Sequence, residues 1–134
     1  MSRPHDQESG FAAVWTILIA SGAFLLLLGL VVDGGSVIDA RLEAKRAAEQ
    51  AARAGADELR GARSGHETVD ADAAAARAQD LLRRAGWSGT VHVGGTRVRV
   101  EVTGSSPTTF LGVIGVSSFP VHESGAATAI TGPQ

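Results

Sequence analysis

The sequence contains no cysteine, no asparagine and no tyrosine, and it has a single lysine beside eleven arginines. The absence of cysteine excludes disulfide bridges, thiol catalysis and cysteine-ligated metal sites. Without asparagine the chain offers no acceptor for N-glycosylation. The net charge is −2, so there is no basic excess of the kind that indicates a nucleic-acid partner.

One long apolar run dominates what is present. Residues 11–32, FAAVWTILIASGAFLLLLGLVV, carry no charge. At ~1.5 Å per helical residue the run reaches roughly 33 Å, which is enough to cross a hydrocarbon core of ~30 Å. The run is too long for the core of a secretory signal, and no small-residue cleavage site follows it. We therefore expect an uncleaved, single-pass transmembrane helix.

The chain divides into four expected segments. Asp33 marks the end of the span because a carboxylate is costly in lipid. The two glycines that follow, Gly34 and Gly35, are candidates for a kink or an interruption of the helix. The segments are a polar leader at 1–10 that is disordered by composition, the transmembrane helix at 11–32, a helical stalk at 33–63, and a small α+β domain at 64–134.

Residues 36–62 predict a helix with one narrow face of small side chains, because strong helix formers dominate and proline is absent. Two interpretations stay open: the helix lies on its own domain, or it packs closely against copies of itself. The face recurs at steps of three and four, and comprises Ala40, Ala44, Ala47, Ala51, Gly55, Leu59 and Ala62. A second small-residue face, which would let another transmembrane helix approach, comprises Ala12, Thr16, Ala20 and Ala23.

The remainder predicts one helix and three strands. Asp70 or Asp72 caps a helix that runs through Ala85, with Gly86 just past its end. Alternation over 90–93 and 96–103, around Gly94-Gly95, predicts a hairpin. Ser105-Ser106-Pro107 is expected to break the second strand, 108–116 (TTFLGVIGV) to form a helical turn or an apolar crossover, and 118–131 to form a third strand. The expected fold class is α+β: a long N-terminal transmembrane helix and helical stalk, then a second helix and a small antiparallel three-stranded sheet.

No pattern in the sequence indicates catalysis. His92 and His122 would approach each other if the third strand paired with the first, but a metal site needs three or four ligands. The nucleophile pattern G-x-S-x-G is absent. We expect no enzyme activity, no cofactor, no metal and no small-molecule substrate. Trp87 has two interpretations, a plug between helix and sheet or an anchor for a partner.

Two stretches of the chain resemble the TadE/TadG-like proteins of Flp-type (tight adherence) pilus systems, which are pseudopilins. They are residues 8–35, from Glu8-Ser9-Gly10-Phe11 through the apolar run to Asp33-Gly34-Gly35, and AAEQAARAGA at 47–56. The resemblance implies cleavage by a prepilin peptidase between Gly10 and Phe11. The sequence departs from the family pattern at Trp15, where the family carries a glutamate that registers each subunit on its neighbour's terminal amine.

The resemblance implies a membrane-anchored, pseudopilin-like minor subunit of a Flp/Tad-type pilus or related secretion assembly, structural rather than catalytic. A non-polymerising, membrane-anchored assembly or interaction factor of such a system is the alternative, and a tethered ligand-binding domain is a third. The expected partners are the lipid bilayer and other pilin-like subunits or pilus machinery. The expected location is the cell membrane, with the C-terminal domain outside the cytoplasm. Against this orientation, the positive-inside rule counts only Arg3 before the span, whereas Arg41, Lys45, Arg46 and Arg53 follow it.

Overall fold

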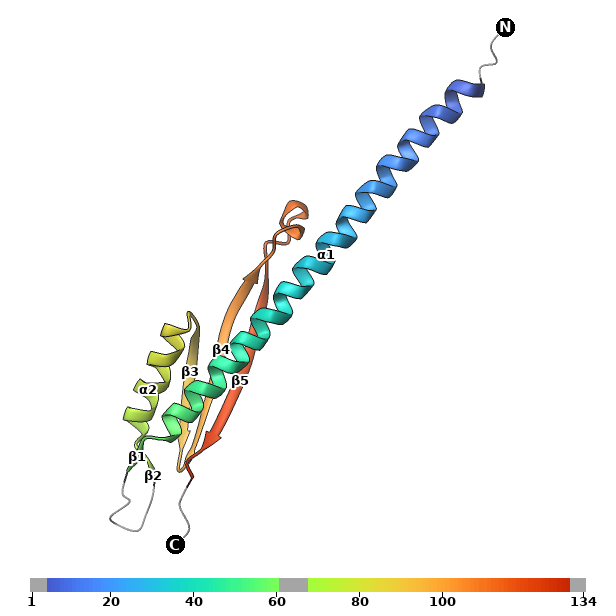
Figure 1. Ribbon diagram of the computed structural model, residues 1–134. Helices are drawn as coiled ribbons and strands as arrows, with labels where there is room; N and C mark the ends of the chain where they lie inside the picture. The colour runs from blue at the N-terminus through green and yellow to red at the C-terminus, as the bar shows by residue number, and fades with distance from the viewer. Residues whose placement is uncertain (1–4, 61–67, 131–134) are drawn as a thin grey trace.

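The computed structural model describes residues 5–60 and 68–130, and Figure 1 shows a long helix with a small α+β body along its C-terminal half. Residues 1–4 of the expected leader, residues 61–67 and residues 131–134 lie outside the described residues. The expected α+β class is confirmed. In chain order the elements are α1 (His5–Ala56), β1 (Leu59–Arg60), β2 (Thr68–Val69), α2 (Ala71–Arg84), β3 (Ser88–Gly94), β4 (Arg97–Pro107), the 3-10 helix η1 (Leu111–Ile114) and β5 (Ser118–Thr128).

The helix α1 is continuous and differs from the sequence prediction at both ends. It begins at His5, so the prediction of disorder through Gly10 is wrong from His5 onward. Gly34 and Gly35 do not interrupt it. The helix ends at Ala56 rather than Ala62, because the chain then forms β1, which pairs antiparallel with β2. Small-residue periodicity within one helix cannot reveal that the chain pairs with a strand that follows it.

The main sheet has the order β3-β4-β5, with both pairs antiparallel. Gly94 pairs with Arg97, so the tight turn consists of Gly95 and Thr96 rather than Gly94-Gly95. Gly95 has a φ of 59°, which suits the first central position of a type II′ turn. The expected break at Ser105-Ser106-Pro107 is wrong, because β4 pairs with β5 out to Pro107. Proline is tolerated there because β3 pairs with β4 only as far as Thr103, so β4 has a partner on one side alone at Pro107. At the other end, β5 stops at Thr128, before the expected Thr131.

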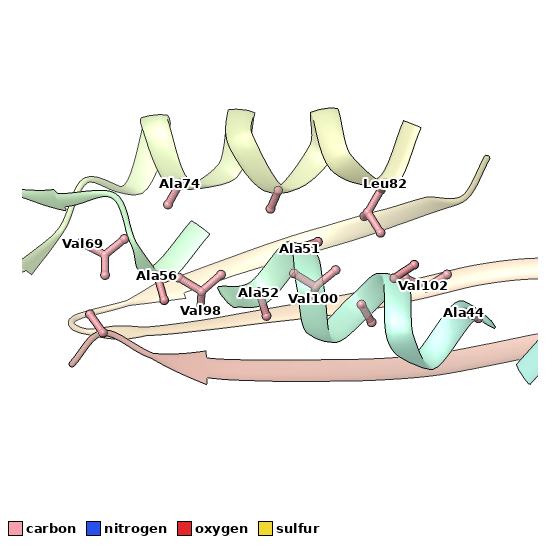
Figure 2. Close-up of a cluster of buried hydrophobic side chains, with 14 of the residues drawn as sticks. Ala44, Ala51, Ala52, Ala56, Val69, Ala74, Leu82, Val98, Val100 and Val102 are labelled. Carbon is pink, nitrogen blue, oxygen red and sulfur yellow. The ribbon is translucent and has the colours of Figure 1, made fainter. Parts of the chain in front are cut away.

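Both helices cover one face of this sheet. Strand β4 alternates as predicted: Val98, Val100 and Val102 are buried, whereas Arg97, Arg99 and Glu101 are exposed. Figure 2 shows these valines facing alanines of α1 and the inner side of α2. The core is therefore thin and built largely from alanine. Its fully buried alanines are Ala44, Ala48, Ala51, Ala52, Ala74 and Ala78.

The second helix and the residue that follows it match the prediction. The Asp70 carboxylate accepts a hydrogen bond from the Ala73 amide at 3.3 Å and caps α2. Gly86 takes a φ of 78° just past its end. Trp87 is partly buried against the core, and a Cβ on Gly104 would lie 2.6 Å from its ring. The plug interpretation of Trp87 is thereby supported.

Candidate functional site

The N-terminal half of α1 presents an apolar surface that the rest of the described chain leaves mostly uncovered. Its large side chains are mostly exposed, from 47% for Leu28 to 72% for Val31. Within the described residues, this helix is long and apolar enough to cross a membrane, and it lies near the N-terminus. Such a contiguous apolar surface is unfavourable in water. It fits a membrane anchor.

Asp33 lies at the end of this surface and is 1% exposed. Its carboxylate accepts hydrogen bonds from three successive backbone amides in the segment between β4 and β5. Oδ1 accepts from Thr109 at 2.8 Å, and Oδ2 accepts from Phe110 at 3.0 Å and from Leu111 at 2.7 Å. We call this arrangement the Asp33 clasp. It ties the end of the apolar run to a segment more than seventy residues further along the chain.

The clasp holds Asp33 in its ionised form. Burial raises the pKa of Asp33, but the hydrogen bonds donated by Leu111, Thr109 and Phe110 together outweigh that effect, so the pKa lies below the ordinary value of 3.8. Unpaired amides at the start of a helical turn favour a carboxylate. Sequence reasoning assigned Asp33 only to the membrane boundary. The short apolar segment TTFLGVIGV was visible, but nothing in the sequence linked the two.

The segment held by the clasp is residues 108–117, which we call the hairpin tip. It carries four large exposed apolar side chains: Phe110 is 50% exposed, Val113 90%, Ile114 59% and Val116 37%. In Figure 1 the tip points along α1 toward the N-terminal half of the helix, away from α2. The sequence allowed a helical turn or a crossover here, and the structure shows a 3-10 turn at the end of a hairpin.

Phe110 lies directly against α1. A Cβ built on Gly29 would come within 2.7 Å of the Phe110 Cβ, so only glycine admits this contact. Beside the contact is an apolar groove of ≈ 700 Å³ between the helix and the tip. The tip side is formed by Phe110, Leu111 and Val113, and the helix side by Gly22, Leu25, Leu26, Leu28, Gly29 and Val32.

The small residues predicted to mediate helix packing fall into two groups. Ala44, Ala47, Ala51 and Gly55 are buried within the chain's own body, and Ala40 is partly buried beside them. In the apolar half of α1, Ala12, Thr16 and Ala20 are exposed. The Thr16 hydroxyl donates to the Ala12 carbonyl at 2.9 Å, which leaves this face without an unpaired donor. Contact of this second group with another helix stays a prediction.

The predicted cleavage junction, Gly10-Phe11, lies inside α1. Phe11 is 69% exposed, and its ring contacts Trp15 edge to face with centroids 6.2 Å apart. An aromatic pair thus occupies the position where the family carries its glutamate. Cleavage stays a prediction.

The two histidines considered as a metal pair are not brought together. His92 on β3 pairs with Arg99, and His122 on β5 pairs with Thr103. The strand β4 lies between them, so the condition under which His92 and His122 would approach, pairing of the third strand with the first, is not met. Among the residues that the structure describes, no group of three or more metal-ligating side chains gathers.

These features define a class of protein, a small α+β body carried on a long helix whose N-terminal half fits a membrane anchor. Residues 10–58 match the family model described as Putative Flp pilus-assembly TadE/G-like. The match confirms the resemblance seen in the sequence, covers nearly all of α1, and relates the chain to Flp pilus assembly. No curated protein and no solved structure matches the chain.

Proposed function

We propose that the chain is a membrane-anchored, pseudopilin-like minor subunit of a Flp/Tad-type pilus or related secretion assembly, with a structural role. One observation carries the proposal. A single uninterrupted helix, His5–Ala56, exposes apolar side chains along its first half and buries one face of its second half against a small domain. The family match covers both halves of that helix.

The proposal places the C-terminal domain outside the cytoplasm and assigns other pilin-like subunits or pilus machinery as partners. The face that contains Ala12, Thr16 and Ala20 is exposed and small enough for another membrane helix to approach closely. The stalk face is already covered by the chain's own sheet and α2. Contacts between subunits are therefore assigned to the apolar half of α1 and to the outer surface of the domain.

One observation favours a second candidate, a non-polymerising assembly factor of the same system. Trp15 occupies the position of the family's glutamate, and it packs against Phe11. An aromatic side chain cannot pair with a neighbouring terminal amine as a carboxylate does. Cleavage after Gly10 by a prepilin peptidase distinguishes the two candidates. The pilus subunit is expected to be cleaved, whereas an assembly factor that never joins the fibre does not require cleavage.

Cleavage between Gly10 and Phe11 is the first prediction. Mass spectrometry of the chain isolated from native membranes is expected to show an N-terminus at Phe11, and Gly10→Val is expected to abolish that product. Gly22→Val is the matched control, because Gly22 lies in the same helix, away from the junction, with no atom near a built Cβ. An intact N-terminus in cells with an active peptidase would favour the assembly factor.

Topology is the second prediction. A reporter that is active only outside the cytoplasm, fused after Gln134, is expected to be active, and a cytoplasmic reporter at the same site is expected to be silent. The basic residues beyond the span make this a stringent test, because the positive-inside rule favours the opposite orientation. Activity of the cytoplasmic reporter alone would refute the proposed orientation.

A further inference from the structure

We propose that the hairpin tip, residues 108–117, is a second membrane contact that inserts shallowly into the lipid bilayer beside α1. Its occupant is lipid, namely the acyl chains and headgroup boundary of the leaflet on the domain side. The inference rests on the proposed function in one respect, that α1 is the membrane anchor. It adds that the domain itself touches the bilayer.

The position of the tip along α1 is the first argument. Phe110 lies against Gly29, which is three residues before Val32, the end of the apolar run. Three helical residues correspond to ~4.5 Å along the axis. Interfacial elements bury their apolar side by ~5–10 Å at the headgroup boundary. A membrane that covers the run up to Val32 therefore also covers the outer part of the tip.

The chemistry of the tip is the second argument. No charged residue occurs anywhere in residues 106–121. Val113 is 90% exposed, more than the other large apolar side chains of the described residues, and Ile114 is 59% exposed. They continue the exposed surface of the apolar run, since Val113 lines the same groove as Leu25 and Leu28. This continuity favours lipid, which already contacts that helix surface, over a separate protein partner.

The backbone of the tip is the third argument, because lipid admits irregular chain only where its polar groups are bonded internally. Asp33 accepts from the amides of Thr109, Phe110 and Leu111. The amides of Thr108, Val113, Gly115 and Val116 bond to carbonyls inside the tip, and the Thr108 hydroxyl donates to the Val116 carbonyl. The tip thus enters a low-dielectric region with most of its amides already paired.

The chain contains no cysteine, so a single introduced cysteine is the only thiol and can be labelled specifically in the full chain. An environment-sensitive fluorophore is attached to Val113→Cys, Leu18→Cys or Thr90→Cys, and each protein is placed in phosphatidylcholine vesicles. Leu18 is in the apolar run and reports the anchor. Thr90 is exposed on β3 and reports the domain surface. Quenching is measured with spin-labelled lipids and with aqueous iodide, and Ile114→Cys repeats the tip measurement in case one label disturbs the turn.

We expect the tip probes to lose fluorescence to a lipid label placed near the headgroups, to show blue-shifted emission and to resist iodide, whereas the Thr90 probe does the opposite. If the Leu18 probe is quenched by lipid but both tip probes respond to iodide like Thr90, the tip inference is wrong and the anchor stands. Protection from both quenchers would indicate a protein neighbour and would equally overturn it. If the Leu18 probe is not quenched by lipid, the anchor fails and the tip inference fails with it.

Discussion

Replacing Asp33 by asparagine is expected to release the hairpin tip from α1. The carboxylate faces three donors, and an amide side chain presents one acceptor and one donor in the same space. Its NH₂ group would therefore oppose a backbone N–H of Thr109 or Leu111. Buried amides that lose a charged acceptor are costly because no water replaces it.

The measurement is hydrogen–deuterium exchange of the full chain in detergent. The amides of Thr109, Phe110 and Leu111 are expected to exchange at least about tenfold faster in Asp33→Asn, since one charged hydrogen bond is worth that factor or more. Asp39→Asn is the matched control, because Asp39 is exposed on the same helix. Unchanged protection at all three amides in Asp33→Asn would show that the clasp does not hold the tip.

The wild-type clasp is also expected to open in acid. The folded-state pKa of Asp33 is depressed, so its stabilising effect is fully present above the ordinary value of 3.8 and is lost as the pH falls through the lower folded-state pKa. Asp33 is the only titratable side chain in residues 10–38, and residues 106–121 contain none. We therefore expect the amides of the tip to lose protection from exchange only below pH 3.8. The same pH dependence is expected to be absent in Asp33→Asn, which would assign it to the Asp33 carboxyl.

The sequence predicted the elements of this fold better than their ends. The apolar run, the Asp70 cap and the alternation at Val98, Val100 and Val102 each depend on local pattern, and each is confirmed. The errors arise where pairing with another strand decides the backbone conformation. Strand β1 replaces the last turns of the stalk because β2 pairs with it, and β4 continues through Ser105 because β5 pairs with it.

The sequence indicated the two parts of the candidate site separately, but not their contact. Asp33 stood out as a carboxylate at the end of an apolar run, and 108–116 stood out as a short apolar segment. Their contact depends on the length of β4 and β5, which carries the tip back along α1, and that length was underestimated at Ser105-Ser106-Pro107. The small face of the stalk was recognised from Ala44, Ala47 and Ala51. Its neighbours Ala48 and Ala52, which are equally buried, were missed because the face wraps further around the helix than one stripe.

The backbone of α1 lies very close to the sheet at Ala48, opposite Gly125. Gly125→Ala is therefore the second substitution for which we expect a large loss of stability. Gly125 lies on β5 directly against the helix backbone. An added Cβ would be 2.5 Å from both the Ala48 carbonyl carbon and the Glu49 nitrogen. Since backbone cannot rotate aside as a side chain does, we expect a loss of about 3 kcal/mol, at the upper end of the range for overpacked cores.

A loss of this size is large for so thin a core, because small domains lie near the lower end of the ~5–15 kcal/mol usual for folded proteins. It corresponds to a fall in Tm of more than about 10 °C, measured by circular dichroism of the full chain in detergent. Gly94→Ala is the matched control: it makes the same change in the same sheet, at an exposed glycine with no atom within 4 Å of a built Cβ. Its expected effect is within about 0.5 kcal/mol. Equal melting of the two variants would contradict the close contact. A Cβ added at Gly125 meets the helix backbone, whereas a Cβ added at Gly94 meets no atom within 4 Å.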